Sequence, residues 1–186
     1  MYGTNAERIE LLNSTAPAFF RTVQDCLWED TLLHLARITD LSRTGGKDNL
    51  TIRRISSMVP NPEHRAKVAE LIEKAINATT FARDWRNRRI AHRDLMLALD
   101  RRTEPLAAAS RAHVKGALAA LGDVLNFLSN RYLQSTTMFE FAAEPSAGGG
   151  SSMLFYLLVG REAELQRRER LKNGTFTKQD LDHRSI

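Results

Sequence analysis

The stretch Ser110-Arg-Ala-His-Val-Lys-Gly-Ala-Leu-Ala-Ala-Leu-Gly-Asp-Val-Leu-Asn-Phe-Leu-Ser-Asn-Arg-Tyr132 carries the clearest helical pattern of this 186-residue sequence. Its large apolar residues are spaced alternately four and three apart: Val114, Leu118, Leu121, Leu125, Leu128 and Tyr132. This spacing puts them on one stripe of an α-helix, as in a coiled-coil seam. Ser110 precedes the stripe, where a hydroxyl can cap the first turn. We therefore predict a long helix that begins after Ser110 and buries this stripe.

Three further segments have the pattern of long helices. Residues 16–39 follow the candidate caps Ser14 or Thr15 and carry Pro17 in the first turn. A segment that begins at Pro62 follows Asn61 as its cap, and Thr79 or Thr80 either caps a new helix or lies within this one. Residues 153–172 are apolar in their first half and charged in their second, as expected of a helix that packs on the core or on a second subunit. The stripe expected to be buried in the first of these helices is Phe20, Val23, Leu27, Trp28, Leu32 and Leu35.

The segments between these helices read as short helices and loops. Residues 6–13 and 50–58 have helical character, whereas Arg43–Asp48 contains a glycine pair and is predicted to be a loop. No stretch alternates apolar and polar residues over a useful length. The predicted fold is therefore all-α, a helical bundle of about four long helices plus short extra helices.

Composition divides the chain into three parts. Residues 1–143 form the predicted helical domain, and residues 144–152 read as a Gly/Ser linker. Residues 153–186 are expected to form a C-terminal helix and a loose polar tail.

Charge and cysteine usage narrow the classes of partner and cofactor. The formal charge is +5, and arginine outnumbers lysine 21 to 6. This balance favours a polyanion such as RNA over a membrane, although a solvated surface with a compositional bias explains the excess equally well. The single cysteine, Cys26, excludes an intramolecular disulfide and falls in an apolar pattern, which predicts a buried thiol in a cytoplasmic protein. The sequence shows no signal peptide and no apolar run long enough to span a bilayer.

The densest group of chemically active side chains lies in Phe81–Asp94. Five arginines occur there within eleven residues: Arg83, Arg86, Arg88, Arg89 and Arg93. Asn87 and His92 accompany them, and a guanidinium can hold a phosphate while an imidazole moves a proton near neutral pH. The other histidines are isolated from one another, and none forms a two-His helical pair with a carboxylate at metal-ligand spacing, so we predict no metal and no cofactor.

The string Arg86-Asn87…Ala-His92-Arg-Asp94 resembles the defining motif of the HEPN superfamily, in its abortive-infection U-type, phage-defence branch. The resemblance extends upstream to Trp28–Asp40 and Asn49–Ile52, and it covers roughly Phe19 to Tyr132. It implies a HEPN-like helical fold and metal-independent RNA cleavage, in phage defence or as a toxin.

The resemblance also implies roles for the motif residues. His92 would take the proton of the substrate 2′-hydroxyl or protonate the leaving oxygen, and Arg86 would hold the non-bridging phosphate oxygens. Asn87 would orient His92 or the phosphate. Arg83, Arg88, Arg89 and Arg93 are expected either to contact RNA phosphates or to form a solvated face.

The spacing of Arg86 and His92 raises a geometric problem. Six residues apart on a straight α-helix, they point about 120° away from each other. Either the helix ends near Ala91 and frees His92, or two copies of the motif face each other across a two-fold axis. HEPN proteins typically pair in the second way, so we predict a homodimer.

Other functions compete with the nuclease. A catalytically silent HEPN module would bind RNA, a nucleotide or a protein partner. A helical antitoxin or regulatory subunit would need no site at all. His92 shares a helical face with Phe81 and Trp85, which is also the pattern of a buried core histidine, and Asp94 would either bind His92 or cap the helix.

Overall fold

A computed structural model describes residues 5–91, 99, 104–139 and 149–182. The chain divides into two compact units, one made of Met1–Asp25 with Ala142–Ile186 and the other of Cys26–Phe141. Helix α2, Pro17–Ile38, supplies residues to both units. The predicted domain boundary at residue 143 lies outside the described residues and stays a prediction.

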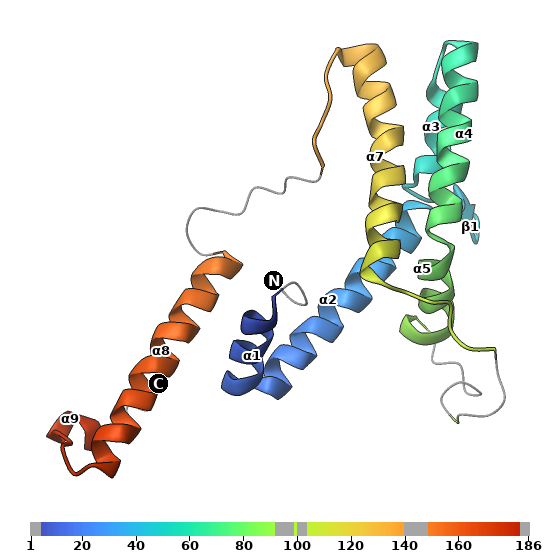
Figure 1. Cartoon of the computed structure of the whole chain (residues 1–186). Helices are drawn as coiled ribbons and strands as arrows, with labels where there is room; N and C mark the ends of the chain where they lie inside the picture. The colour runs from blue at the N-terminus through green and yellow to red at the C-terminus, as the bar shows by residue number, and fades with distance from the viewer. Residues whose placement is uncertain (1–4, 92–98, 100–103, 140–148, 183–186) are drawn as a thin grey trace. The chain divides into compact units, whose positions relative to one another are not determined.

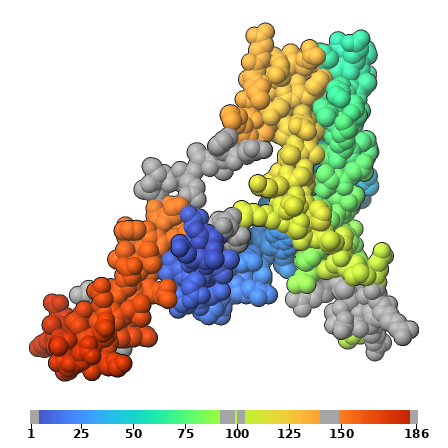
Figure 2. Space-filling view, viewed as in Figure 1, coloured from blue at the N-terminus to red at the C-terminus, as the bar shows by residue number. Residues whose placement is uncertain are grey.

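The unit Cys26–Phe141 is built around two long helices. Helix α4, Pro62–Ala78, and helix α7, Arg111–Leu133, run side by side in opposite directions (Figure 1). The ring of His64 at the start of α4 contacts Tyr132 near the end of α7, with Nδ1 and the phenol oxygen 3.2 Å apart. Figure 2 shows that side chains fill the space between the two helices.

Local signals set the starts of both helices. The Asn61 side chain accepts a hydrogen bond from the His64 amide, and Pro62 follows it as the first helical residue. The Ser110 hydroxyl accepts from the His113 amide in the same way. Both predicted caps are confirmed, because each satisfies backbone N–H groups that the first turn leaves without partners.

The core of this unit joins α4 and α7 to the second half of α2 and to helix α5, Thr80–Trp85. Its most deeply buried side chains are Leu32, Leu35, Val68, Ile72, Ala75, Ala82, Ala117 and Val124. Leu32, Val68 and Val124 expose none of their surface, and burial of such side chains supplies the main driving force for folding.

The buried stripe of α7 differs from the predicted seam. Val114 and Leu121 are buried as expected, but Ala117 and Val124 complete the stripe. Leu118, Leu125 and Tyr132 are 52%, 39% and 47% exposed, so the prediction was wrong for all three. Ala117 and Val124 belong to the core cluster that also contains Val68 and Ile72 of α4, so the contact face is turned away from the two leucines. In α2, Leu27 is likewise exposed, contrary to prediction.

The glycine pair forms a hairpin and not the predicted irregular loop. Strand β1, Arg43–Thr44, pairs antiparallel with strand β2, Lys47–Asp48. Gly45 and Gly46 have φ angles of 57° and 80°, and a two-residue turn with both angles positive suits glycine. The following helical segment begins after Thr51, later than predicted, as a 3-10 turn η1, Ile52–Arg54, and helix α3, Ile55–Met58.

The other unit contains α1, Ala6–Thr15, the first part of α2, α8, Gly150–Lys172, and α9, Lys178–Leu181. Leu11, Leu12, Phe20 and Leu154 form its apolar cluster. Ser14 and Thr15 do not cap α2, because both hydroxyls donate to the Leu11 carbonyl within α1.

Three predictions, one on α2 and two on the C-terminal part of the chain, need correction. The Cys26 thiol is exposed and not buried. The segment Thr177–Leu181 is not loose, because Asp180 forms a capping box with Thr177 and binds Arg170 on α8. The predicted linker residues Ser151 and Ser152 already belong to α8.

These elements confirm the all-α fold. Four helices of the described residues are long, α2, α4, α7 and α8, and a two-stranded hairpin accompanies them. No helix in this part of the chain is both long enough and apolar enough to cross a bilayer.

A candidate active site at the end of α2

Two buried threonines join the ends of α2 and α4. The Oγ1 atoms of Thr39 and Thr79 lie 2.9 Å apart, and neither side chain reaches solvent. Each hydroxyl also contacts carbonyls of its own helix, Leu35 for Thr39 and Ala75 for Thr79. Buried hydroxyls need such partners, so this pair fixes the point where both helices end.

Two arginines bind the backbone at this point. Arg53 Nε and Arg83 Nη2 each donate to the Thr39 carbonyl oxygen at 2.9 Å. The last carbonyls of a helix lack intrahelical partners and carry partial negative charge, which attracts cations. Burial lowers the pKa of the Arg83 guanidinium, and the charge of Arg53 lowers it further while Asp40 opposes the shift. Arg83 nevertheless stays charged at any physiological pH.

The motif residue Arg86 completes the cluster. Its Nη1 atom lies 2.5 Å from Asp40 Oδ2, and its Nε donates to the Asn87 side-chain oxygen at 3.0 Å. The side chains of Arg86 and Asp40 are 21% and 27% exposed. A guanidinium has five N–H donors, so Arg86 retains donors for a further acceptor.

The backbone at Arg86 leaves the α-helical path. Residues Arg86–Ile90 form a π-helical turn, η2, in which the Ala91 amide donates to the Arg86 carbonyl at 2.8 Å. This i to i+5 bond places Ala91 one turn beyond Arg86, where an α-helix would place Ile90. The assumption of a straight α-helix was therefore wrong here. His92, Arg93 and Asp94 lie outside the described residues.

The remaining predicted phosphate-binding arginines differ in their surroundings. Arg83 supports the end of α2 through Thr39. Arg88 binds the Glu104 and Pro105 carbonyls and lies 3.5 Å from the Asp84 carboxylate. Of the three, Arg89 is the most exposed, with Glu29 3.7 Å away.

Arg88 belongs to a group of contacts that fastens the segment before α7. Asp84 accepts a hydrogen bond from the Ala107 amide, and Trp85 Nε1 donates to the Ala107 carbonyl at 2.8 Å. Trp85 thus has a structural role, and the Arg89 guanidinium lies 5.3 Å from its ring centre.

The balance of charge at the end of α2 is positive. Arg53, Arg83 and Arg86 lie around Thr39 and Asp40, with three cations against the one carboxylate of Asp40. Such a cluster attracts phosphate groups. In the described residues, no three His, Cys, Asp or Glu side chains are grouped as metal ligands would be.

Sequence reasoning missed Asp40, Thr39 and Arg53 as members of this cluster. The sequence offered a signal for Asp40, because this residue ends Trp28–Asp40, the upstream stretch over which the chain resembles the HEPN family. Thr39 lies in the same stretch, whereas Arg53 had no such signal, and its partner Thr39 is remote in sequence.

The fold and this cluster define the class of this protein. It is an all-α protein in which the motif arginine, Arg86, lies on a π-helical turn and contacts Asp40 at the end of the core helix α2. A family model named HEPN_AbiU2, with the description AbiU2, matches residues 1–151. The chain therefore belongs to the AbiU2 family of the HEPN superfamily. No curated protein and no solved structure matches the chain.

Proposed function

We propose that this chain is a metal-independent endoribonuclease that acts in phage defence or as a toxin. The observation that carries the proposal is the position of Arg86. Its guanidinium stands in a basic cluster, keeps unused donors, and precedes His92 by six residues in a family whose motif contains both.

The reaction needs no metal and no external nucleophile. The 2′-oxygen of the substrate attacks the adjacent phosphorus, the bond from phosphorus to the 5′-oxygen breaks, and a 2′,3′-cyclic phosphate and a 5′-hydroxyl result. His92 removes the 2′-hydroxyl proton or supplies the proton that the leaving oxygen receives. Arg86 stabilises the negative charge on the non-bridging oxygens. General acid–base help of this kind contributes about 10²–10⁴-fold to the rate.

Asn87 and the other arginines have supporting roles in this proposal. Asn87 accepts from Arg86 Nε and so orients the guanidinium. Arg89, the more exposed neighbour, contacts a flanking phosphate, as does Arg93. Arg83 and Arg88 act mainly through the backbone they hold in place.

Each chain has one Arg86/His92 pair, which suits a site shared by two copies. In the proposed homodimer the two motif segments face each other across the axis, so that one phosphate meets both sets of side chains. An antitoxin or another protein partner would then act by covering this cleft.

The test is RNA cleavage by the purified full chain in EDTA. We expect fragments that end in cyclic phosphate, and their yield should fall at least 100-fold in Arg86→Ala and His92→Ala. Arg37→Ala and His34→Ala are matched controls, because both side chains are exposed on α2. Cleavage that needs added Mg²⁺, or equal loss in the controls, would contradict the mechanism.

One observation favours the second candidate, a catalytically silent module that binds RNA, a nucleotide or a protein. The Asp40 carboxylate already neutralises Arg86, which weakens its pull on a phosphate. A chain that binds RNA but gives no fragments in EDTA, with or without His92, would support this reading.

A further inference from the structure

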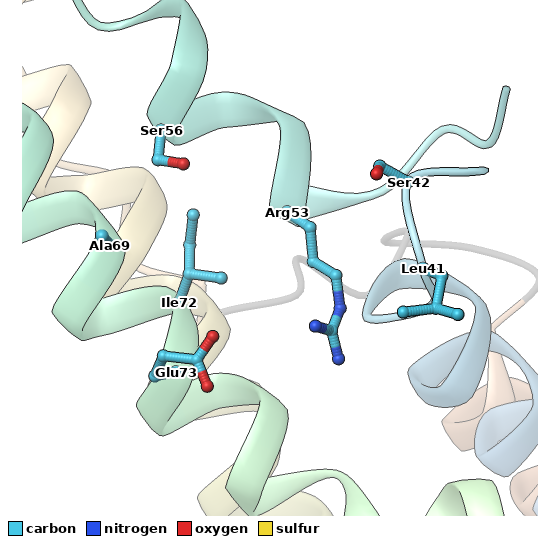
Figure 3. Close-up of a pocket in the computed structure, with 7 residues that line it drawn as sticks. All are labelled: Leu41, Ser42, Arg53, Ser56, Ala69, Ile72 and Glu73. Carbon is cyan, nitrogen blue, oxygen red and sulfur yellow. The ribbon is translucent and has the colours of Figure 1, made fainter.

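A cavity of about 320 Å³ opens beside Arg53 in the unit Cys26–Phe141 (Figure 3). Its polar lining consists of Arg53, Glu73, Ser42 and Ser56. Leu41, Ala69 and Ile72 supply the apolar lining. The cavity is open to solvent, because Leu41, Ser42, Ala69 and Glu73 are exposed, and its volume is at the lower end of the range for small-molecule sites.

Arg53 is fixed in this cavity by one atom only. Its Nε donates to the Thr39 carbonyl, and its terminal nitrogens have no hydrogen-bond partner within the described ranges. Figure 3 shows the guanidinium directed into the space between α4 and the Leu41–Ser42 segment. The two terminal nitrogens can therefore bind an anion in the bidentate manner typical of arginine.

Glu73 faces the same space from α4. No ion pair or hydrogen bond engages its carboxylate in the part of the chain that the structure describes. Arg53 and Glu73 thus line one cavity without pairing with each other. Opposite charges held apart in this way suit a ligand that has an anionic group at one end and hydrogen-bond donors at the other.

We propose that this cavity binds a guanine nucleotide unit, as the base-recognition subsite of the RNA substrate. The proposal rests on the function proposed above. The carboxylate of Glu73 accepts two hydrogen bonds from the base, the exposed Leu41 side chain contacts one of its faces, and Arg53 binds the adjoining phosphate. Ser42 and Ser56 provide hydroxyls for the ribose or the phosphate.

The preference for guanine follows from hydrogen-bonding patterns. A carboxylate offers two acceptor oxygens side by side. On its Watson–Crick edge, guanine presents two adjacent donors, N1–H and the N2 amino group. Adenine, cytosine and uracil each place an acceptor next to their donor, so a carboxylate that pairs with them leaves one oxygen facing another acceptor.

The cavity is joined to the Arg86 cluster by the backbone. Asp40, which binds Arg86, directly precedes Leu41 and Ser42 in the cavity wall. The Cα atoms of Asp40 and Ser42 are at most about 7.6 Å apart. Arg53 and Arg83 share the Thr39 carbonyl as acceptor. The wall of the cavity and the residue that binds Arg86 are therefore consecutive in the chain.

The test measures nucleotide binding apart from cleavage. The full-length chain, carrying His92→Ala to prevent turnover, is titrated with GMP, AMP, CMP and UMP and followed by protein NMR. We expect GMP to bind at least tenfold more tightly than the other three. Glu73→Gln replaces one acceptor with a donor and should remove most of this preference. Glu63→Gln, with the same charge change on α4, should keep it.

Short RNAs separate a substrate subsite from a site for free nucleotides. A dinucleotide with a 5′ guanosine should bind more tightly than GMP if the subsite belongs to an RNA groove. Equal binding of all four mononucleotides, or equal effects of Glu73→Gln and Glu63→Gln, would overturn the guanine site. Guanine-selective binding by a chain that does not cut RNA would support the guanine site and would contradict only the proposed nuclease activity.

Discussion

The Arg86 guanidinium lies 2.5 Å from the Asp40 carboxylate, Nη1 to Oδ2, although 46 residues separate them in sequence. This contact brings the motif arginine to the end of α2, where Thr39 already holds Arg53 and Arg83. Asp40 therefore does two things at once. It orients Arg86, and it cancels part of the positive charge that a phosphate would meet.

Removal of the Asp40 charge tests the second effect. In Asp40→Asn, Arg86 loses its anionic partner, so we expect tighter binding of single-stranded RNA at low salt. One more phosphate contact should steepen the slope of log affinity against log salt by about 0.7. Fluorescence anisotropy over a salt series measures both quantities.

Asp25→Asn is the matched control for this measurement, because Asp25 pairs with Arg21 on the exposed face of α2. It changes the net charge by the same amount and should leave the slope unaltered. Weaker RNA binding by Asp40→Asn would mean that the carboxylate chiefly positions Arg86.

The hydroxyl pair of Thr39 and Thr79 should contribute measurably to stability. Thr79→Val keeps the shape of the side chain but leaves the Thr39 hydroxyl without one of its partners. We expect the free energy of unfolding to fall by about 1–2 kcal/mol in denaturant titrations. The double variant Thr39→Val/Thr79→Val should lose less than the sum of the single variants, because their effects are coupled.

Thr80→Val serves as the control for this cycle. Thr80 follows Thr79 directly, but its side chain is exposed and bonds only to the Asn77 carbonyl. Thr80→Val should change the free energy of unfolding by about 0.5 kcal/mol or less. Strict additivity of Thr39→Val and Thr79→Val would show that the two hydroxyls do not depend on each other.

Two leucines three residues apart on α7 should differ in their effect on stability. Leu121 is 7% exposed in the core, whereas Leu118 is 52% exposed. Leu121→Ala should lower the free energy of unfolding by about 2–5 kcal/mol, because it leaves a cavity against α4. Leu118→Ala should change it by about 0.5 kcal/mol or less in the monomer.

A large loss in Leu118→Ala that grows with protein concentration would place Leu118 in a subunit interface. Thermal unfolding of both variants at two concentrations provides the measurement. Equal losses that are independent of concentration would contradict the buried stripe seen in α7.

The attachment of α9 to α8 should weaken in acid. The Arg170 side chain, together with the Thr177 amide, holds the pKa of the Asp180 carboxyl well below its ordinary range. A lowered folded-state pKa means that the contribution to stability is complete above the unfolded-state pKa, about 3.9. It declines as the pH falls below that value toward the pKa of the folded state.

NMR signals of residues 178–181 between pH 6 and pH 2.5 report this loss. In Asp180→Asn the signals should shift toward unfolded positions already at pH 6 and should lose their acid transition. Asp182→Asn is the control, because Asp182 is exposed at the end of α9. A transition that survives in Asp180→Asn would assign the acid sensitivity to another group.

Predictions from local patterns succeeded where the physical cause is local. The starts of α4 and α7 follow from Asn61, Pro62 and Ser110, because a capping side chain satisfies amides two or three residues away. The prediction that the Cys26 thiol is buried was wrong for the opposite reason. An apolar sequence pattern marks a face of a helix, and only the packing of other segments decides whether that face is covered.

The sequence by itself determined that the chain is helical, where α4 and α7 begin, and that its densest basic motif surrounds Arg86 and precedes His92. These properties depend on side-chain spacing and on capping, which act over a few residues. The tertiary structure alone decided that Asp40 binds Arg86, that Thr39 gathers Arg53 and Arg83, and that Glu73 faces Arg53 across a cavity. Each of these relationships joins residues at least 14 positions apart, so it arises only when α2, α4 and α5 pack together.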